Sequence, residues 1–411
     1  MIDRRQFIKG GVAGLVAVGG GIFLPRLSWA EKLSLGPKQL PSGALKSAIL
    51  DALPGKRPLI KKTFRPPNYE TPVEYFNDTF TPNDAFFVRY HLADIPEVKA
   101  DVWRLHIGGD AVQQPLELTL ADLKRNHEVI EIAAVCQCSG NRRGLYQPHV
   151  PGVQWGYGAM GNAVWKGVRL RDVLNKAGVK KEALEVAFDG ADKGNLDKTP
   201  DFIKSIPIWK ALDENTLIAF EMNGHPLPHW NGYPARLVVS GWTATYWVKH
   251  LTSVHVTSQR FKGFWMDTAY RIPRDKFPLV ERFLSQETET NTPITEMVVN
   301  SLITNLKEGQ RWPSGQTVQV HGIAWDGGYG IQTVEITTDG GNTWYYARLG
   351  KDYGRFSWRQ WRFAFKPKGR GSHVIMAKAA NRMGQTQVSD LILNPAGYHH
   401  NVIHQVTITV G

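Results

Sequence analysis

Alternation of hydrophobic and polar residues is clearest in the last part of the chain. Val318–Trp325 alternates, Asp326-Gly327-Gly328 follows it, and further alternating runs cover residues 334–338, 358–365, 373–379 and 403–410. A period of two is typical of strands with one buried face, and Gly/Asp-rich intervals are typical of turns. Asp339–Trp344 fits a turn between two strands. We therefore expect residues 291–411 to form a β-sandwich of six or seven strands with immunoglobulin-like proportions.

The preceding residues mix short strands with a few helices. Thr119 can cap a helix that ends near Asn126, and Leu170–Ala177 reads as a helix stopped by Gly178. Strands are expected over residues 102–107, 128–135, 235–240 and 253–257. Upstream, residues 44–53 are expected to form a helix and residues 68–72 a loop. The chain is therefore predicted to be α+β, with a mixed core domain at 76–290 before the β-sandwich.

The first thirty residues have the pattern of a targeting signal. Arg4-Arg5 precedes the glycine-interrupted apolar stretch Gly10–Leu24, and Ser28-Trp29-Ala30 resembles a small-x-small cleavage site. The alternative is a membrane anchor, but the stretch is shorter than the roughly 20 residues that a spanning helix needs. We predict a twin-arginine signal peptide at 1–30, a lead-in at 31–75, a periplasmic location and no membrane span in the mature chain.

Composition narrows the class of protein. The 411-residue chain is 42% hydrophobic and 21% charged, with a formal net charge of +12. These values are typical of a globular protein, and the absence of dense Lys/Arg runs disfavours nucleic acid as a partner. The only two cysteines, Cys136 and Cys138, are one residue apart, a spacing that makes a disulfide between them improbable.

Cys138-Ser139-Gly140-Asn141-Arg142-Arg143 is the stretch with the most chemical information. It follows an apolar run, so Cys138 is expected on a loop at the end of a strand. A thiolate can bind a soft metal, and adjacent guanidinium groups can bind an anion. The alternatives are a buried inert thiol and surface ion pairs. We read Cys136 as a structural thiol, and expect Arg143 rather than Arg142 to reach the anion.

Several segments in fixed order then resemble the sulfite oxidase family of molybdenum enzymes, from about residue 75 onward. They are Phe87–His91, Cys138–Arg143, Trp155–Ala159, Trp165–Leu170, Phe188–Asp192, Ser205–Pro207, Glu221–Pro228, Gly232–Arg236, Trp247–Lys249 and Asp339–Trp344. The loop Thr268–Pro273 looks like the form found in bacterial, haem-free sulfite dehydrogenases.

This resemblance implies a role for each matching residue. Cys138 matches the molybdenum ligand, and Arg89, Arg143, Trp155 and Tyr270 match residues lining the substrate pocket. The implied molybdopterin-binding residues are Phe87, Val88, Arg89, Tyr90, His91, Asp192, Asn231, Arg236, Trp247, Val248 and Lys249. Arg89 and His91 lie two residues apart and would share one face of a strand.

The sequence also departs from the family pattern at three positions. Tyr90 stands where the family more often has asparagine, and Asn231 where animal members often have histidine. Ala396 stands where plant and animal members place a second-domain arginine in the pocket. His399 and His400 lie nearby, and we hypothesise that they replace some of that positive charge.

The implied function is oxidation of sulfite to sulfate at a molybdenum–molybdopterin centre. No Cys-x-x-Cys-His motif occurs, so we expect no covalent haem in this chain and a separate c-type cytochrome as electron acceptor. The β-sandwich is expected to support a homodimer. The alternatives are a sulfane dehydrogenase, disfavoured by the double arginine, a sulfoxide reductase, disfavoured by the second domain, and a secreted β-rich binding protein.

Overall fold

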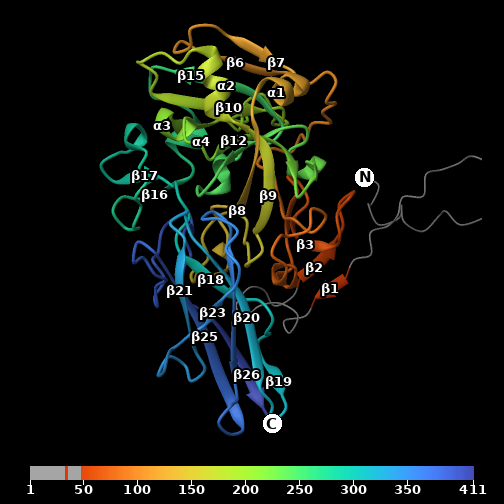
Figure 1. Ribbon diagram of the computed structural model, residues 1–411, viewed down its shortest axis with the longest axis vertical. Coiled ribbons are helices and arrows are strands. Elements are labelled where there is room, and N and C mark those ends of the chain that lie inside the picture. Colours follow the sequence, from red (N-terminus) through yellow and green to blue (C-terminus); the bar gives the residue numbers. More distant parts are fainter. Residues whose placement is uncertain (1–32, 36–47) are drawn as a thin grey trace, which may run out of the picture. The chain divides into compact units, whose positions relative to one another are not determined.

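The computed structural model describes residues 33–35 and 48–411, which belong to one compact unit (Figure 1). The predicted signal peptide and part of the predicted lead-in lie outside the described residues. Mixed sheets dominate and the helices are short: α1 (Leu120–Asn126), α2 (Leu170–Ala177), α3 (Ile208–Ala211) and α4 (Phe264–Asp267). This matches the predicted α+β class.

The first sheet is an antiparallel meander. Its strands, in spatial order, are β1 (Leu33–Leu35), β2 (Ala48–Asp51), β3 (Leu59–Thr63), β4 (Asn68–Glu70) and β5 (Val88–Arg89). Val88 and Tyr90 pack with Leu59 and Tyr69 in a small buried cluster. One face of the β5 segment is therefore buried within the meander, and its other face is free to contact the rest of the molecule.

Two sequence predictions fail in this meander. Residues 48–51 form β2 rather than the end of a helix, and β4 occupies most of the expected loop at 68–72. Both segments are short and gain their hydrogen bonds from neighbours, because β2 pairs with β1 and β3, and β4 pairs with β3 and β5. Sheet pairing decides the conformation here over the weak local pattern.

The next two sheets form the core domain. One contains β11 (Lys204–Pro207), β10 (Glu185–Gly190), β15 (Leu251–Thr257), β6 (Leu105–Gly108) and β7 (Leu116–Leu118). The other contains β13 (His225–Pro226), β12 (Thr216–Met222), β9 (Met160–Arg169) and β8 (Val129–Gln137), with β14 (Arg236–Val239) also paired to β12. β6 starts three residues later than predicted, because Asp101 and Val102 form a turn.

The predicted helices have the predicted caps. In α1, the Thr119 hydroxyl accepts a hydrogen bond from the Asp122 amide, and the Asp122 carboxylate accepts one from the Thr119 amide. This reciprocal pair satisfies two free donors at the helix start. Gly178 ends α2 in the left-handed conformation with φ 70°.

The C-terminal sheets form the expected β-sandwich. One contains β18 (Asn300–Ile303), β20 (Val318–Trp325), β24 (Arg359–Phe365) and β23 (Arg348–Leu349). The other contains β19 (Gln310–Trp312), β26 (His404–Val410), β25 (Gly371–Asn381), β21 (Ile331–Thr337) and β22 (Tyr345–Tyr346). A small ladder of β16 (Arg271–Pro273) and β17 (Asn291–Pro293) precedes them. Among the described residues, the two sandwich sheets contain nine strands where six or seven were expected, because the sequence patterns did not reveal the short strands β18, β19 and β23.

A hydrophobic cluster joins the core domain to the sandwich. Val135 and Met160 from β8 and β9 pack with Leu302, Ile323 and Trp325 from β18 and β20. The amide of Val135 also donates to the carbonyl of Phe356 at 2.9 Å. β8, the strand that leads to Cys138, is thus held by β9 in the core domain and by residues of the sandwich. No helix among the described residues has the length and apolarity to cross a membrane.

Candidate active site

One cavity gathers most of the predicted site residues. It encloses about 600 Å³ of space, part of it open to solvent. The predicted residues that line it are Phe87, Arg89, His91, Cys138, Asp192, Asn231, Arg236, Trp247, Val248, Lys249 and Tyr270. Val88, Tyr90, Arg143 and Trp155 were also predicted and do not line it. Residues from distant segments thus converge on one space, with the Cys138 thiol in its wall.

The loop after β8 places Cys138. β8 pairs with β9 along its full length, and the register ends at Gln137 opposite Met160. The Cys138 amide then donates to the Ala159 carbonyl at 2.9 Å, and the Asn141 amide donates to the Cys138 carbonyl at 2.9 Å. The thiol therefore stands at the end of a strand on a hydrogen-bonded turn, as predicted.

Cys136 has a different environment. Its side chain is buried, and its sulfur lies 4.0 Å from Nη2 of Arg236. Burial raises the pKa of the Cys136 thiol to about 11, partly offset by the Arg236 charge. A thiol with so high a pKa stays protonated near neutral pH, which agrees with the predicted structural role.

Arg142 turns away from the cavity. Its guanidinium donates to Asn300 Oδ1 at 2.5 Å and to the Ser301 carbonyl at 2.9 Å, both in β18. It also lies 5.0 Å from the ring centroid of Tyr157 and 5.6 Å from that of Trp325. Arg142 is therefore a buried tie between the Cys138 turn and the sandwich, a role that the sequence did not reveal.

Arg143 lies next to the cavity rather than in its wall. Its Nε donates to the Ala396 carbonyl at 2.8 Å, and its Nη1 donates to the Val153 carbonyl at 3.2 Å. The guanidinium is 5.1 Å from the Tyr398 ring centroid, and Tyr398 stacks on Tyr270 with centroids 5.6 Å apart. Arg143 therefore faces the reacting end of the site through two aromatic rings.

Glycines make room for Arg143. A Cβ on Gly140 would lie 2.6 Å from Nη1 of Arg143, and one on Gly152 would lie 2.7 Å from it. Trp155 packs nearby in the hydrophobic core and is fully buried, with its indole nitrogen unpartnered among the described residues. Its carbonyl accepts a hydrogen bond from the amide of Gly144, next to Arg143, at 2.8 Å, and its side chain does not line the cavity.

His399 and His400 do not supply the charge that we hypothesised. His399 packs on Phe277 with centroids 4.9 Å apart, and His400 packs on Tyr146 with centroids 5.6 Å apart. Burial lowers the pKa of each to about 3, so both are neutral at physiological pH. Ala396 adds no positive charge either, but its backbone carbonyl accepts a hydrogen bond from Arg143 and so helps to fix that guanidinium.

The β5 segment alternates as predicted. Phe87, Arg89 and His91 line the cavity, whereas Val88 and Tyr90 point into the small cluster on the other side. Burial holds the pKa of His91 well below its usual value, and the charge of Arg89 lowers it further. A neutral His91 beside a cationic Arg89 gives this wall one hydrogen-bonding group and one fixed charge.

Two basic side chains, Lys249 and Arg236, also line the cavity. The Lys249 ammonium donates to the Arg89 carbonyl at 2.6 Å and lies 3.8 Å from the Tyr90 ring centroid. Arg236 donates to the carbonyls of Asn231 and Trp247, both at 3.0 Å. Burial lowers the pKa of Lys249 to about 7 and also lowers that of Arg236. An anion bound here would favour both charged forms.

Tyr270 and His91 form a hydrogen-bonded pair across the cavity. The Tyr270 hydroxyl lies within hydrogen-bonding distance of His91 Nε2. Burial raises the pKa of Tyr270, an effect opposed by the Arg89 charge, so the phenol is protonated at neutral pH. The backbone of Tyr270 has φ 59°, a left-handed conformation that is costly for a bulky residue.

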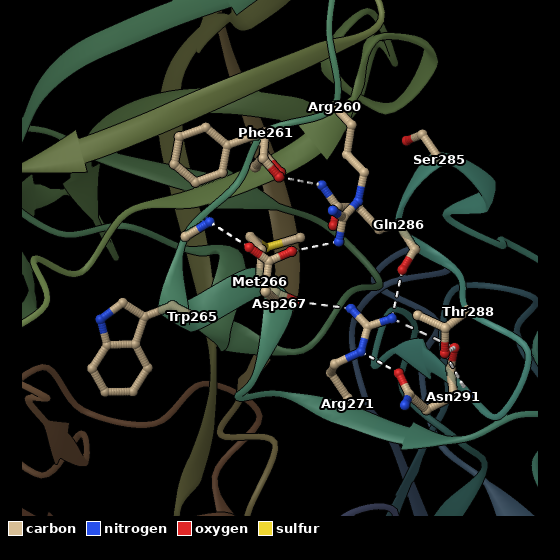
Figure 2. A network of polar contacts seen from close by, with 12 residues as sticks. Arg260, Phe261, Trp265, Met266, Asp267, Arg271, Ser285, Gln286, Thr288 and Asn291 are labelled. Atoms are coloured by element: carbon tan, nitrogen blue, oxygen red, sulfur yellow. Dashed lines mark hydrogen bonds and ion pairs between the residues drawn. The ribbon is translucent and has the colours of Figure 1, made fainter.

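Arg271, the residue after Tyr270, is held by several hydrogen bonds, and Figure 2 shows its contacts with Met266, Gln286 and Asn291. Its guanidinium donates to the carbonyls of Met266 at 2.7 Å and Gln286 at 2.5 Å, and it also bonds to Asn291. The loop that contains Tyr270 is thereby tied to the segment that leads into β17. The strained backbone of Tyr270 is held by contacts on both of its neighbouring segments.

Sequence reasoning missed several cavity residues. They are Phe86, Cys136, Ser139, Phe202, Trp230, Ala244 and Thr245. Most of them lie within a few positions of Phe87, Cys138, Asn231 or Trp247 in the chain. This nearness to a predicted residue is the sequence feature that could have identified them. Phe202 is different, because only its stacking on His91, with centroids 3.6 Å apart, brings it to the site.

The buried ammonium of Lys56, behind Asn231, gives the stability a pH dependence. It donates to Asn231 Oδ1 at 2.6 Å, and burial lowers its pKa from 10.5 to about 7. Between these two pKa values the unfolded chain binds more protons than the folded chain, so the free energy of unfolding rises as pH increases through this window.

We expect Lys56→Met to flatten this rise in the free energy of unfolding, measured by urea unfolding at pH 7 to 9.5. Lys61→Met, at a partly buried ion pair with Asp51, should keep the rise. An unchanged slope in Lys56→Met would contradict the assignment.

Comparisons with known proteins identify the class of this chain. The model of the oxidoreductase molybdopterin binding domain matches residues 91–265, and that of the Mo-co oxidoreductase dimerisation domain matches residues 291–411. The chain is 34% identical to mitochondrial sulfite oxidase of Homo sapiens over 373 residues, covering 87% of this chain and 67% of that protein. It is also 34% identical to sulfite oxidase of Gallus gallus, covering 80% and 72%.

A solved structure agrees with these matches. The sulfane dehydrogenase SoxCD from Paracoccus pantotrophus superposes with a TM-score of 0.72 at 26% identity, covering 85% of this chain and 88% of that one. The chain therefore belongs to the sulfite oxidase family of molybdopterin oxidoreductases.

The residues of the cavity fit a molybdenum–molybdopterin cofactor. Nε of Arg236 and Oγ1 of Thr245 are buried without a hydrogen-bond partner among the described residues. Over the same residues, no cluster of three or more His, Cys, Asp or Glu side chains has the geometry of a metal site. A metal at Cys138 thus needs further ligands from a cofactor, and the unpartnered donors suit a polar, anionic one.

Proposed function

We propose that this protein is a periplasmic sulfite dehydrogenase, which converts sulfite and water to sulfate, two electrons and two protons. Cys138 is the protein ligand of the metal, and Arg236, Lys249, Asn231 and Asp192 hold the pterin. The electrons pass one at a time to a separate c-type cytochrome. The Arg4-Arg5 signal supports export of the folded, cofactor-loaded chain.

The residues around the thiol have the chemistry that this reaction needs. The bound molybdenum cofactor would supply the two-electron redox step. Arg89 meets the sulfite oxyanion with a fixed charge, and Arg143 adds positive potential from behind the Tyr398 and Tyr270 rings. The Tyr270 hydroxyl and neutral His91 form a pair that can donate a hydrogen bond and carry a proton away from the reacting oxygen.

The main support for this proposal is that one cavity is lined by Cys138, Arg89, His91 and Tyr270. A metal ligand, a fixed cation and a proton-handling pair around a small space suit a small oxyanion. The 34% identity to sulfite oxidases supports the choice of sulfite. The dimerisation-domain match supports a homodimer built through residues 291–411.

A sulfane dehydrogenase is the second candidate, because SoxCD has a similar structure. The double arginine is weaker evidence against it than the sequence suggested. Arg142 bonds to Asn300 and Ser301, so only Arg143 of the pair remains near the site. Such an enzyme would act on a sulfur atom linked to a carrier thiol instead of free sulfite.

Metal analysis and turnover test the proposal. We expect about one molybdenum per chain in the exported protein, and sulfite-dependent reduction of ferricyanide or a c-type cytochrome. Sulfite and a thiol-linked sulfane should be assayed in parallel. Molybdenum with turnover of the sulfane alone would replace the first candidate by the second. A protein free of molybdenum would overturn both.

A further inference from the structure

Lys204 is a buried amine that the proposed reaction does not use, and burial lowers its pKa well below the usual value for a lysine. It begins β11 and is 1% exposed. Among the described residues, no carboxylate lies within ion-pairing distance of its side-chain nitrogen. Lys210, which is equally buried, instead pairs with Asp213 at 3.2 Å and Glu281 at 2.9 Å. Burying a charge without a counter-ion is costly, so the contacts that Lys204 does make need an explanation.

Most of those contacts are with the segment that contains Trp265 and Tyr270. The Lys204 amine donates to the Trp265 carbonyl at 2.6 Å. It also lies 5.0 Å from the Tyr270 ring centroid and 4.8 Å from that of Tyr246. The neighbouring carbonyl, that of Met266, accepts from Arg271. The side chains of Lys204 and Arg271 therefore hold two consecutive carbonyls of α4, just before Tyr270 in the chain, and Lys204 also contacts the Tyr270 ring.

The same segment contacts the other member of the pair. Phe202, two residues before Lys204, stacks on His91 with centroids 3.6 Å apart and an interplanar angle of 11°. Phe202 also packs edge-on against Trp265, with centroids 5.1 Å apart. Residues 202–204 thus touch both His91 and Tyr270 from one side, so the geometry of the pair depends on this segment.

We propose that Lys204 is a positioning residue that holds the Tyr270 hydroxyl against His91 for the reaction. The left-handed backbone of Tyr270 makes such a restraint necessary, because a bulky residue at φ 59° relaxes when its surroundings permit. The Lys204 amine restrains both α4, through its hydrogen bond to the Trp265 carbonyl, and the Tyr270 ring, through direct contact with it. The turnover test of this role depends on the proposed sulfite oxidation, whereas a structural test does not.

Turnover of variants tests whether Lys204 acts through Tyr270. Lys204→Met removes the amine that makes both contacts, and we expect kcat for sulfite to fall about 10- to 100-fold. In a Tyr270→Phe background the same change should alter kcat less than about twofold, because the hydroxyl it positions is absent. Lys204→Arg, which keeps a hydrogen-bond donor, should recover most of the loss. Lys210→Met is the matched control, expected to lower stability while kcat stays within about twofold.

Hydrogen exchange on the full-length chain gives a readout independent of any substrate. Lys204→Met should speed amide exchange over residues 264–271, whereas Lys210→Met should leave that segment unchanged. Unchanged exchange in Lys204→Met would overturn the proposal, as would an equal fall in kcat with and without the Tyr270 hydroxyl. A wild-type enzyme inactive on sulfite would refute the proposed function, and exchange would still decide the role of Lys204.

Discussion

Replacement of Cys138 by serine should reduce sulfite turnover by at least about 10³-fold, a loss of about 4 kcal/mol in transition-state stabilisation. A serine hydroxyl stays protonated and is a poor ligand for a soft metal, whereas a thiolate binds one well. The fold should persist, because the turn is held by backbone hydrogen bonds from the Cys138 amide and to the Cys138 carbonyl. Turnover, molybdenum content and far-ultraviolet circular dichroism measure these outcomes.

Cys136→Ser is the matched control for this prediction. It makes the same substitution two residues away, at a thiol whose raised pKa keeps it protonated. We expect this variant to retain at least a tenth of the activity and its full metal content. Turnover retained in Cys138→Ser, or lost equally in both variants, would refute the assignment of Cys138 as the metal ligand.

Replacement of Arg142 by methionine should lower the free energy of unfolding by about 3 to 5 kcal/mol. The change removes two hydrogen bonds from a charged donor, each worth about 1.5 to 3 kcal/mol. It also removes two buried cation–π contacts, leaving Asn300 Oδ1 and the Ser301 carbonyl without that donor. The shift in the urea unfolding midpoint measures the effect.

Arg143→Met provides the comparison, because it removes the neighbouring guanidinium. Arg143 also donates to two carbonyls, but these bonds are longer and only partly buried, so we expect a smaller loss of about 1.5 to 3 kcal/mol, with a raised KM for sulfite. Opposite outcomes, with Arg142→Met stable but weak in sulfite binding, would show that Arg142 contacts the substrate.

The sequence predicted the parts of the site that depend on local patterns. The apolar run before Cys138 places the thiol at a strand end, and the spacing of Arg89 and His91 places both on one face. The Thr119 cap and the sandwich strands are likewise coded by residues close in sequence. Alternation and capping are local properties, so a single sequence is enough to read them.

Other parts of the structure depend on contacts between distant segments. Arg142 meets β18 across more than 150 positions of the chain, and nothing next to it predicts that partner. Lys204 and Phe202 reach the site because β11 lies beside the Tyr270 loop. The helix expected at 44–53 fails for the same reason, since pairing with β3 makes residues 48–51 a strand.

The tie between Arg142 and β18 limits how far the two halves can be exchanged between relatives. The turn that presents Cys138 is completed by Asn300 and Ser301, which belong to the sandwich. A chimaera that kept the core and took its sandwich from elsewhere would have to bring compatible acceptors at these positions. The sandwich is thus part of the scaffold of the proposed metal ligand, so a substitution at Asn300 or Ser301 should alter the turn that carries Cys138.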